Sequence, residues 1–96
     1  MNARNLKPSF EEIIETLHAS REVCSRYEKK HDMLSEQFHE LYSQGLLDDD
    51  GVNHDFTDWA GSYKTVLACQ QEYANLLKQA TPAEKVTHLR ADALVA

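Results

Sequence analysis

A group of aspartates beside a histidine, between residues 44 and 63, is the part of the chain best suited to chemistry. The acids are Asp48, Asp49, Asp50, Asp55 and Asp58. Clustered carboxylates can hold Ca²⁺, but an EF-hand loop also needs an acid or amide at position 1, Gly at position 6 and Glu at position 12. With Gly51 at position 6, Leu46 and Thr57 occupy positions 1 and 12. The register therefore does not fit an EF-hand.

Other metal and catalytic arrangements have little support in the sequence. A looser oxygen site from Asp48, Asp50 and Asp55, or a site pairing His54 with His39, stays open as an alternative. No HExxH motif and no pair of histidines four residues apart occurs. We therefore predict no resident metal, no cofactor and no catalytic residue.

The two cysteines, Cys24 and Cys69, lie on or beside helical apolar stripes and not in a CxxC pair. Cysteine on such a face usually behaves as a small hydrophobic residue. We expect both thiols to be free, with a disulfide between them as the minority alternative.

Two long helices are predicted to position these groups. The first begins at the capping box "SFEE", with Ser9 as the N-cap and Glu12 reaching back to it, and fades near "EKKHD". The second runs from Asp55, the predicted N-cap, to about residue 79, with apolar residues at steps of three and four. Trp59 is expected near the edge of the core, with its indole N–H bonded.

Two shorter helices complete the prediction. One runs from Ser35, as its cap, to about Ser43, and Gly45 ends it. The connector that follows should turn Leu46 and Leu47 inward. The other begins at "TPAEK", where Thr81, Pro82 and Glu84 form a helix-start signature.

The fold class expected is all-α: a small helical bundle of two long antiparallel helices, a short middle helix and a short C-terminal helix. We place the bundle domain at residues 1–80 and a helical extension at 81–96. The long helices outreach the middle one, so part of their apolar stripe should be uncovered, and a homodimer or a protein partner would bury it.

Acidic charge is concentrated in one segment. The 96 residues carry a formal net charge of −6, and residues 35–58 contain seven acids with no Lys or Arg. Such a band repels a phosphate backbone and attracts a basic protein surface. The sequence thus argues against direct nucleic-acid binding. Because no run of about 18 apolar residues and no apolar leader occurs, we expect a cytosolic protein without a membrane span.

The middle of the chain, "MLSEQFHELYSQGLLDDDGVNHDFTDWAGSYKTVL", has a distinctive pattern. The positions that define it are Met33, Ser35, Phe38, Tyr42, Gly45, Asp48, Asp49, Asp55, Phe56, Trp59, Ala60 and Tyr63. In this pattern the chain resembles a family of small bacterial and archaeal proteins encoded as antitoxins in toxin–antitoxin operons. The chain departs from the family in its "GVN" insert and its long C-terminal extension. The resemblance implies a helical protein that binds and neutralises a toxin and performs no catalysis.

We therefore predict a non-enzymatic protein–protein interaction module whose partner presents a basic surface, such as a toxin or nuclease. The predicted contact residues are Glu36, Glu40, Asp48, Asp49, Asp50, Asp55, Asp58, Trp59, Val86 and Leu89. Two alternatives are kept. One is an acidic inhibitor that mimics nucleic acid, such as a phage protein directed against host defence. The other is a metal-binding helical domain.

Overall fold

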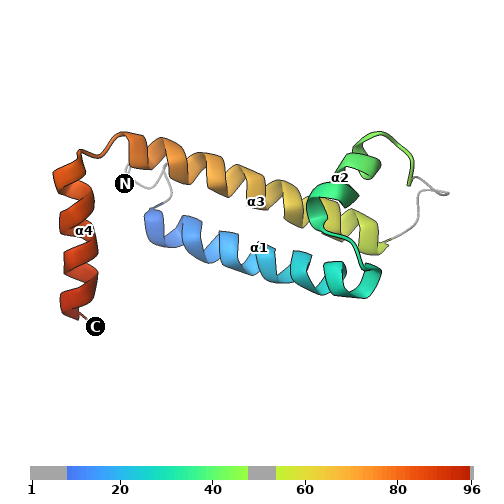
Figure 1. Cartoon of the computed structure of the whole chain (residues 1–96), viewed down its shortest axis with the longest axis horizontal. Coiled ribbons are helices and arrows are strands. Elements are labelled where there is room, and N and C mark those ends of the chain that lie inside the picture. Colours follow the sequence, from blue (N-terminus) through green and yellow to red (C-terminus); the bar gives the residue numbers. More distant parts are fainter. Residues whose placement is uncertain (1–8, 48–53, 96) are drawn as a thin grey trace, which may run out of the picture.

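The chain folds into four helices and is all-α in the part that the structure describes, residues 9–47 and 54–95 of a computed structural model (Figure 1). The two long helices, α1 (Phe10–His31) and α3 (His54–Lys78), run antiparallel and pack along each other. The short helix α2 (Ser35–Ser43) packs mainly on α3, where α1 ends and α3 begins. The predicted fold class is confirmed.

Helix α1 begins and ends through local interactions that the sequence indicates. The Ser9 hydroxyl accepts a hydrogen bond from the backbone N–H of Glu12 over 3.1 Å, and the Glu12 carboxylate accepts one from Ser9 over 3.0 Å. This reciprocal pair is the predicted capping box. Asp32, with φ of 54°, adopts the left-handed conformation that ends the helix.

Helix α2 differs from the prediction at both ends. Its N-cap is Leu34, and Ser35 is the first helical residue, so the prediction of Ser35 as the cap is wrong. The Ser35 side chain is instead used in a tertiary contact described below. Gly45, with φ of 77°, follows the helix as predicted. Leu46 is 65% exposed, so its predicted inward position is wrong, whereas Leu47 packs against the core.

Helix α3 begins at His54, which places Asp55 inside the first turn. The prediction of Asp55 as the N-cap is therefore wrong. Gly61, in the same helix, has nothing within 4 Å of where its Cβ would lie, so no described helix crosses close to it.

The core lies where α1, α2 and α3 meet. Its largest fully buried side chains are Phe38 and Trp59, each only 1% exposed, and Cys24, Ala60 and Val66 complete the buried cluster. Because α2 covers Trp59, the predicted position of this residue at the edge of the core is wrong. Both cysteines are buried and free, as expected.

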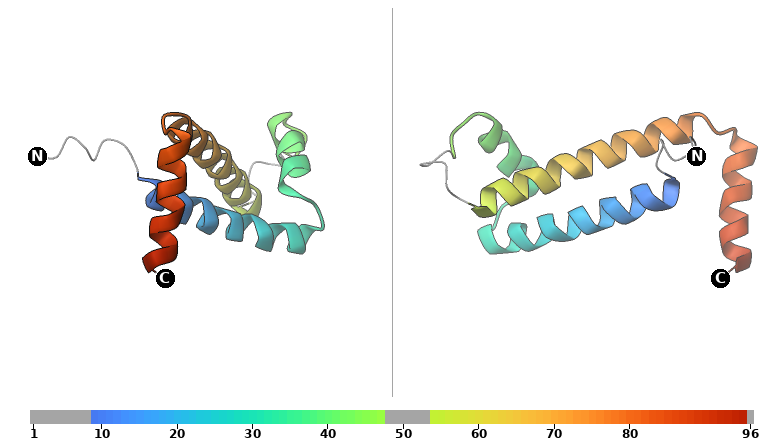
Figure 2. Two further views of the ribbon diagram at one scale, coloured as in Figure 1. Left: turned by 60° about the vertical axis from the view of Figure 1, so that its left-hand side comes forward. Right: turned by 180° about the vertical axis from the view of Figure 1, so that it is seen from behind.

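Helix α4 (Pro82–Val95) turns away from the end of α3 and lies across the open end of the α1–α3 pair (Figure 2). Its start is the predicted one, since Thr81 and Glu84 exchange hydrogen bonds of 3.1 and 2.7 Å. The domain boundary after residue 80 stays a prediction. Within the described residues, no helix is long and apolar enough to cross a membrane.

Candidate functional site

A buried polar chain joins the three helices at the core. The Trp59 indole Nε1 donates to the Ser35 hydroxyl over 2.7 Å. Ser35 donates to the Glu28 carboxylate from its hydroxyl over 2.7 Å and from its backbone N–H over 2.9 Å. Glu28 lies on α1, Ser35 on α2 and Trp59 on α3. A single serine therefore fixes the relative positions of all three helices, which explains why it is buried rather than capping α2.

Aromatic rings surround this polar chain. The Trp59 ring stacks on Phe38 with centroids 3.8 Å apart, and it also lies nearly parallel to His31 at 5.5 Å. His31 stacks on Tyr27 as well and meets the ring of Phe56 edge-on. His31 is the last residue of α1, so its ring ties the end of that helix to α3.

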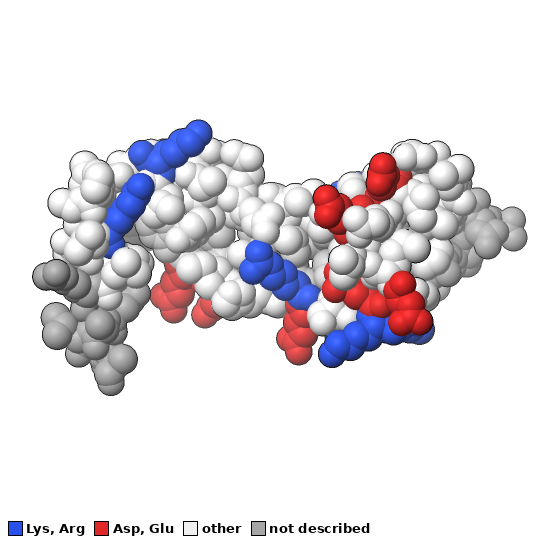
Figure 3. Space-filling model, in the orientation of Figure 1, with Lys and Arg blue, Asp and Glu red and all other residues white. Residues whose placement is uncertain are grey.

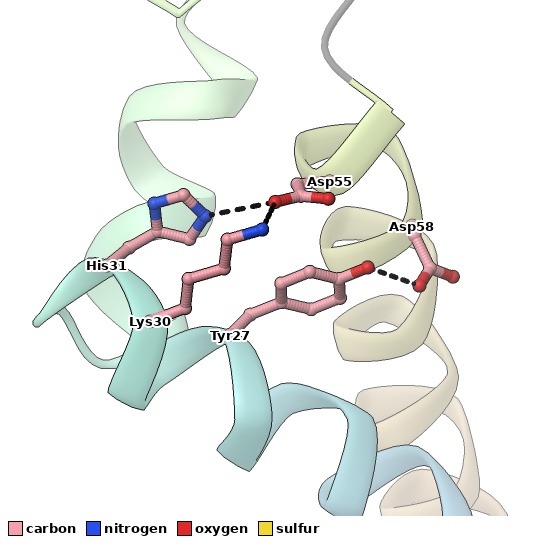
Figure 4. Close-up of polar contacts among 5 residues, drawn as sticks. All are labelled: Tyr27, Lys30, His31, Asp55 and Asp58. Atoms are coloured by element: carbon pink, nitrogen blue, oxygen red, sulfur yellow. Dashed lines mark hydrogen bonds and ion pairs between the residues drawn. The ribbon is translucent and has the colours of Figure 1, made fainter.

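Polar contacts at the surface join the end of α1 to the start of α3 (Figure 4). The Lys30 ammonium lies 2.6 Å from the Asp55 carboxylate, and His31 Nε2 lies 3.5 Å from the same oxygen. The Tyr27 hydroxyl donates to Asp58 over 2.8 Å. The hydrogen bond from Lys30 lowers the pKa of Asp55. The hydrogen bond to Asp58 raises the pKa of Tyr27.

Because of these contacts, some acids of the band have partners within the chain. In the sequence the band contains no base, but in space Lys30 of α1 reaches one of its acids. Two of the predicted contact residues, Asp55 and Asp58, are thus engaged within the chain. A third, Trp59, is buried and cannot reach a partner in this structure. The role of these three residues in partner binding stays a prediction.

Of the three exposed acids in the described part of the band, Asp58 accepts a hydrogen bond from Tyr27, which leaves Glu36 and Glu40. They lie four residues apart, so they share one face of α2. Both are exposed, and neither forms an ion pair with another described residue. Asp48, Asp49 and Asp50 lie outside the described residues, so their predicted role is not addressed by the structure.

The remaining predicted contacts lie far from these acids. Val86 and Leu89, 48% and 68% exposed, are on α4, and α2 lies at the opposite end of the molecule. Figure 3 shows acidic side chains over the α2 end, with Lys and Arg side chains beside them at the lower edge. The predicted contact residues that the structure describes therefore lie at two separate ends of the molecule.

Among the hollows of the described surface, two differ in their walls. One, of about 320 Å³, is lined by Cys24, Glu28, Ser35 and Tyr63 among others. Burial raises the pKa of the Cys24 thiol, which disfavours the nucleophilic thiolate. The other, of about 630 Å³, lies between α4 and the open end of α1 and α3 and has mainly apolar walls.

Metal ligands are not grouped in the part of the chain that the structure describes: no three His, Cys, Asp or Glu side chains there could hold one ion. His54 is exposed at the start of α3, while the His39 ring packs on Tyr63.

The residues that sequence reasoning missed are Tyr27, Glu28, Lys30 and His31. Each lies in the last turns of α1. In the sequence, Tyr27 continues the apolar stripe of the helix, and the other three look like ordinary polar residues near its end. For Glu28 alone the spacing could have indicated its contact, because Ser35 follows it by seven residues across a short turn. The contacts of the others depend on where α3 begins in space.

The chain was compared with family models, curated proteins and solved structures, and none of them matches it.

Proposed function

We propose that this chain is a non-enzymatic binding protein whose acidic α2 face engages a protein partner with a basic surface. The observation that carries the proposal is the pair Glu36 and Glu40, exposed on one face of α2 and without an ion-pair partner among the described residues. Unpaired carboxylates held on a packed helix keep their charge available for steering and binding a cation-rich surface.

The rest of the α2 end supports a scaffold role. The Ser35 hydroxyl, the one buried polar side chain among the described residues, joins Glu28 to Trp59. The Cys24 thiol is buried and its pKa is raised. The roles of Ser35 and Cys24 favour a structural function, in which the core holds α2 in place, over a reactive centre.

The antitoxin role implied by the sequence resemblance is the finer form of this proposal. A ribonuclease-like toxin offers a basic surface that an acidic helix face could cover. A nucleic-acid mimic is less well supported, because Asp55 and Asp58 are occupied by internal contacts and fewer carboxylates remain to imitate a row of phosphates.

The test is affinity purification of the chain from its native host, with the captured proteins identified by mass spectrometry. We expect a basic protein that binds the wild-type chain and is lost with the Glu36→Lys, Glu40→Lys variant. The matched control, Glu22→Lys with Glu72→Lys, makes the same change in net charge at exposed positions outside the band. Equal loss of the partner with both variants would reject the α2 face as the binding surface.

A further inference from the structure

The smaller of the two hollows, beside the start of α2, contains a carboxylate with no counter-ion among the described residues. Its volume of about 320 Å³ is near the lower end for ligand pockets, so it suits a single side chain rather than a larger molecule. Its walls come from α1, α2 and α3: Arg21, Cys24, Glu28, Ser35, Tyr63 and Val66. Ser35 directly precedes Glu36 in the chain, so the hollow adjoins the proposed acidic face of α2.

The carboxylate is that of Glu28, which is half-buried and held in one orientation. Its Oε2 accepts both hydrogen bonds from Ser35, over 2.7 and 2.9 Å. Its Oε1 accepts no hydrogen bond from a described residue, and Glu28 forms no ion pair with one. A charge that is partly withdrawn from water is costly unless it is paired. Glu28 therefore offers a fixed acceptor to a cation.

Negative charge dominates at the hollow, although Arg21 lines it. Burial is the main cause that raises the pKa of the Tyr63 hydroxyl, and the charges of Glu36 and Glu28 raise it further. Burial also raises the pKa of the Cys24 thiol most, and Glu28 adds to that rise. Arg21 is exposed and lies seven residues before Glu28 on α1, about 10 Å along the helix axis, so water and salt screen its charge.

Tyr63 and the apolar wall favour arginine among the cations. The Tyr63 hydroxyl makes no hydrogen bond with a described residue, so it is a second acceptor beside Glu28. A guanidinium is planar, has five donors and can lie against an aromatic ring. Val66 and Cys24 offer an apolar surface to the aliphatic part of the side chain.

We propose that this hollow receives an arginine side chain of the basic partner, whose guanidinium binds the Glu28 carboxylate and the Tyr63 hydroxyl. The inference rests on the proposed function, because the arginine belongs to the protein that the α2 face binds. It adds to that function a specific anchor on α1 and α3, next to the acids of α2.

The first test titrates the full chain with Nα-acetyl-arginine amide, which carries only the guanidinium charge, and follows backbone NMR shifts. We expect saturable shifts at Cys24, Ser35 and Val66, with a dissociation constant on the order of 1 mM for a ligand of about fifteen non-hydrogen atoms. The matching citrulline derivative has nearly the same shape without the charge. At equal ionic strength it should cause no such shifts.

The Glu28→Gln variant tests the carboxylate. Its amide oxygen can still accept from Ser35, but the charge is lost, so binding of the blocked arginine should weaken by about tenfold or more. Glu22→Gln, at an exposed position of the same helix, makes the same change in net charge and should have no effect. Circular dichroism verifies that both variants are folded. Equal binding by the two variants, or no saturable shift up to about 50 mM, overturns the proposal.

Free arginine distinguishes a side chain from a small metabolite. Its α-carboxylate could pair with Arg21, so tighter binding of free than of blocked arginine would overturn a partner side chain as the occupant. Equal or weaker binding of free arginine supports the proposal, because then the guanidinium alone is recognised.

The second test measures the affinity of the captured partner for the same two variants by titration calorimetry. We expect Glu28→Gln alone to weaken binding by about tenfold or more. If both variants bind the partner as the wild type does, this proposal fails while the α2 function stands. If no basic partner is captured, the proposed function fails, and the titration with blocked arginine still decides whether the hollow binds a guanidinium.

Discussion

The Trp59 indole nitrogen lies 2.7 Å from the Ser35 hydroxyl, to which it donates a hydrogen bond. Trp59 is on α3 and Ser35 is the first residue of α2, so this contact joins the short helix α2 to the long helix α3. The Ser35 hydroxyl in turn donates a hydrogen bond to the Glu28 carboxylate of α1. The bond thus belongs to the contact set that holds the proposed binding face in place.

Removing the Ser35 hydroxyl should destabilise the fold. The Ser35→Ala variant leaves the buried indole N–H without its acceptor, which should cost about 1–3 kcal/mol of the free energy of unfolding. Urea denaturation followed by circular dichroism measures the loss. Ser43→Ala, an exposed serine of the same helix, should change stability by less than about 0.5 kcal/mol. A Ser35→Ala variant as stable as this control would contradict the role given to the hydroxyl.

Truncating Phe38 should be more severe. Phe38 is 1% exposed and stacks on Trp59 at 3.8 Å, so Phe38→Ala removes a buried ring and leaves a cavity. The expected loss is about 3–5 kcal/mol, enough to unfold a marginally stable domain. Thermal unfolding followed by Trp59 fluorescence would report it. Leu46→Ala, at an exposed position, should be nearly silent, and a similar effect of both changes would argue against the core described here.

Local sequence signals predicted the helices well. The boxes at Ser9–Glu12 and Thr81–Glu84 were correct because every group involved lies within four residues of its partner. Gly45 was correct for the same reason, since its positive φ is set by the local backbone.

The sequence did not predict contacts between helices. Ser35 and Asp55 were assigned as caps because both residue types favour that role. In the fold they meet Trp59 and Lys30, which are 24 and 25 positions away, and these tertiary contacts replace the local ones. Trp59 was expected at the edge of the core because the sequence does not show that α2 packs over it. Tertiary packing also brings Lys30 to Asp55 and Tyr27 to Asp58, so these two acids of the band have partners that the sequence did not indicate.

The ion pair of Lys30 with Asp55 predicts a pH dependence of stability. The pKa of Asp55 is lowered in the fold from its ordinary value of 3.8, mainly by the hydrogen bond from Lys30. Its contribution is therefore fully present above about pH 4 and is lost as the pH falls through the lower folded-state pKa. Wild type should be more stable than Asp55→Asn at pH 7, and the difference should shrink in acid.

Urea unfolding of both proteins at pH 7 and near pH 2 measures this difference. Glu72→Gln, at an exposed position of α3, should show none. A gap between wild type and Asp55→Asn that stays constant down to pH 2 would be inconsistent with the pair.

Thiol reactivity provides an independent check of the core. Cys24 and Cys69 are 5% and 7% exposed, and burial raises the pKa of Cys24. Labelling by Ellman's reagent should be at least about tenfold slower in the folded chain than in urea, because the thiols react through opening of the structure. A cysteine placed at exposed Ser43 should react at the unfolded rate. Rapid labelling of the native cysteines would refute their burial.

The central claim, that the α2 face binds a basic protein, is tested most directly by the affinity of the captured partner for purified variants. Titration calorimetry at two salt concentrations would compare wild type, Glu36→Lys with Glu40→Lys, and Glu22→Lys with Glu72→Lys. The account predicts at least about tenfold weaker binding for the α2 variant alone, and weaker wild-type binding at high salt. Equal affinities for the two variants, or binding unaffected by salt, would contradict it.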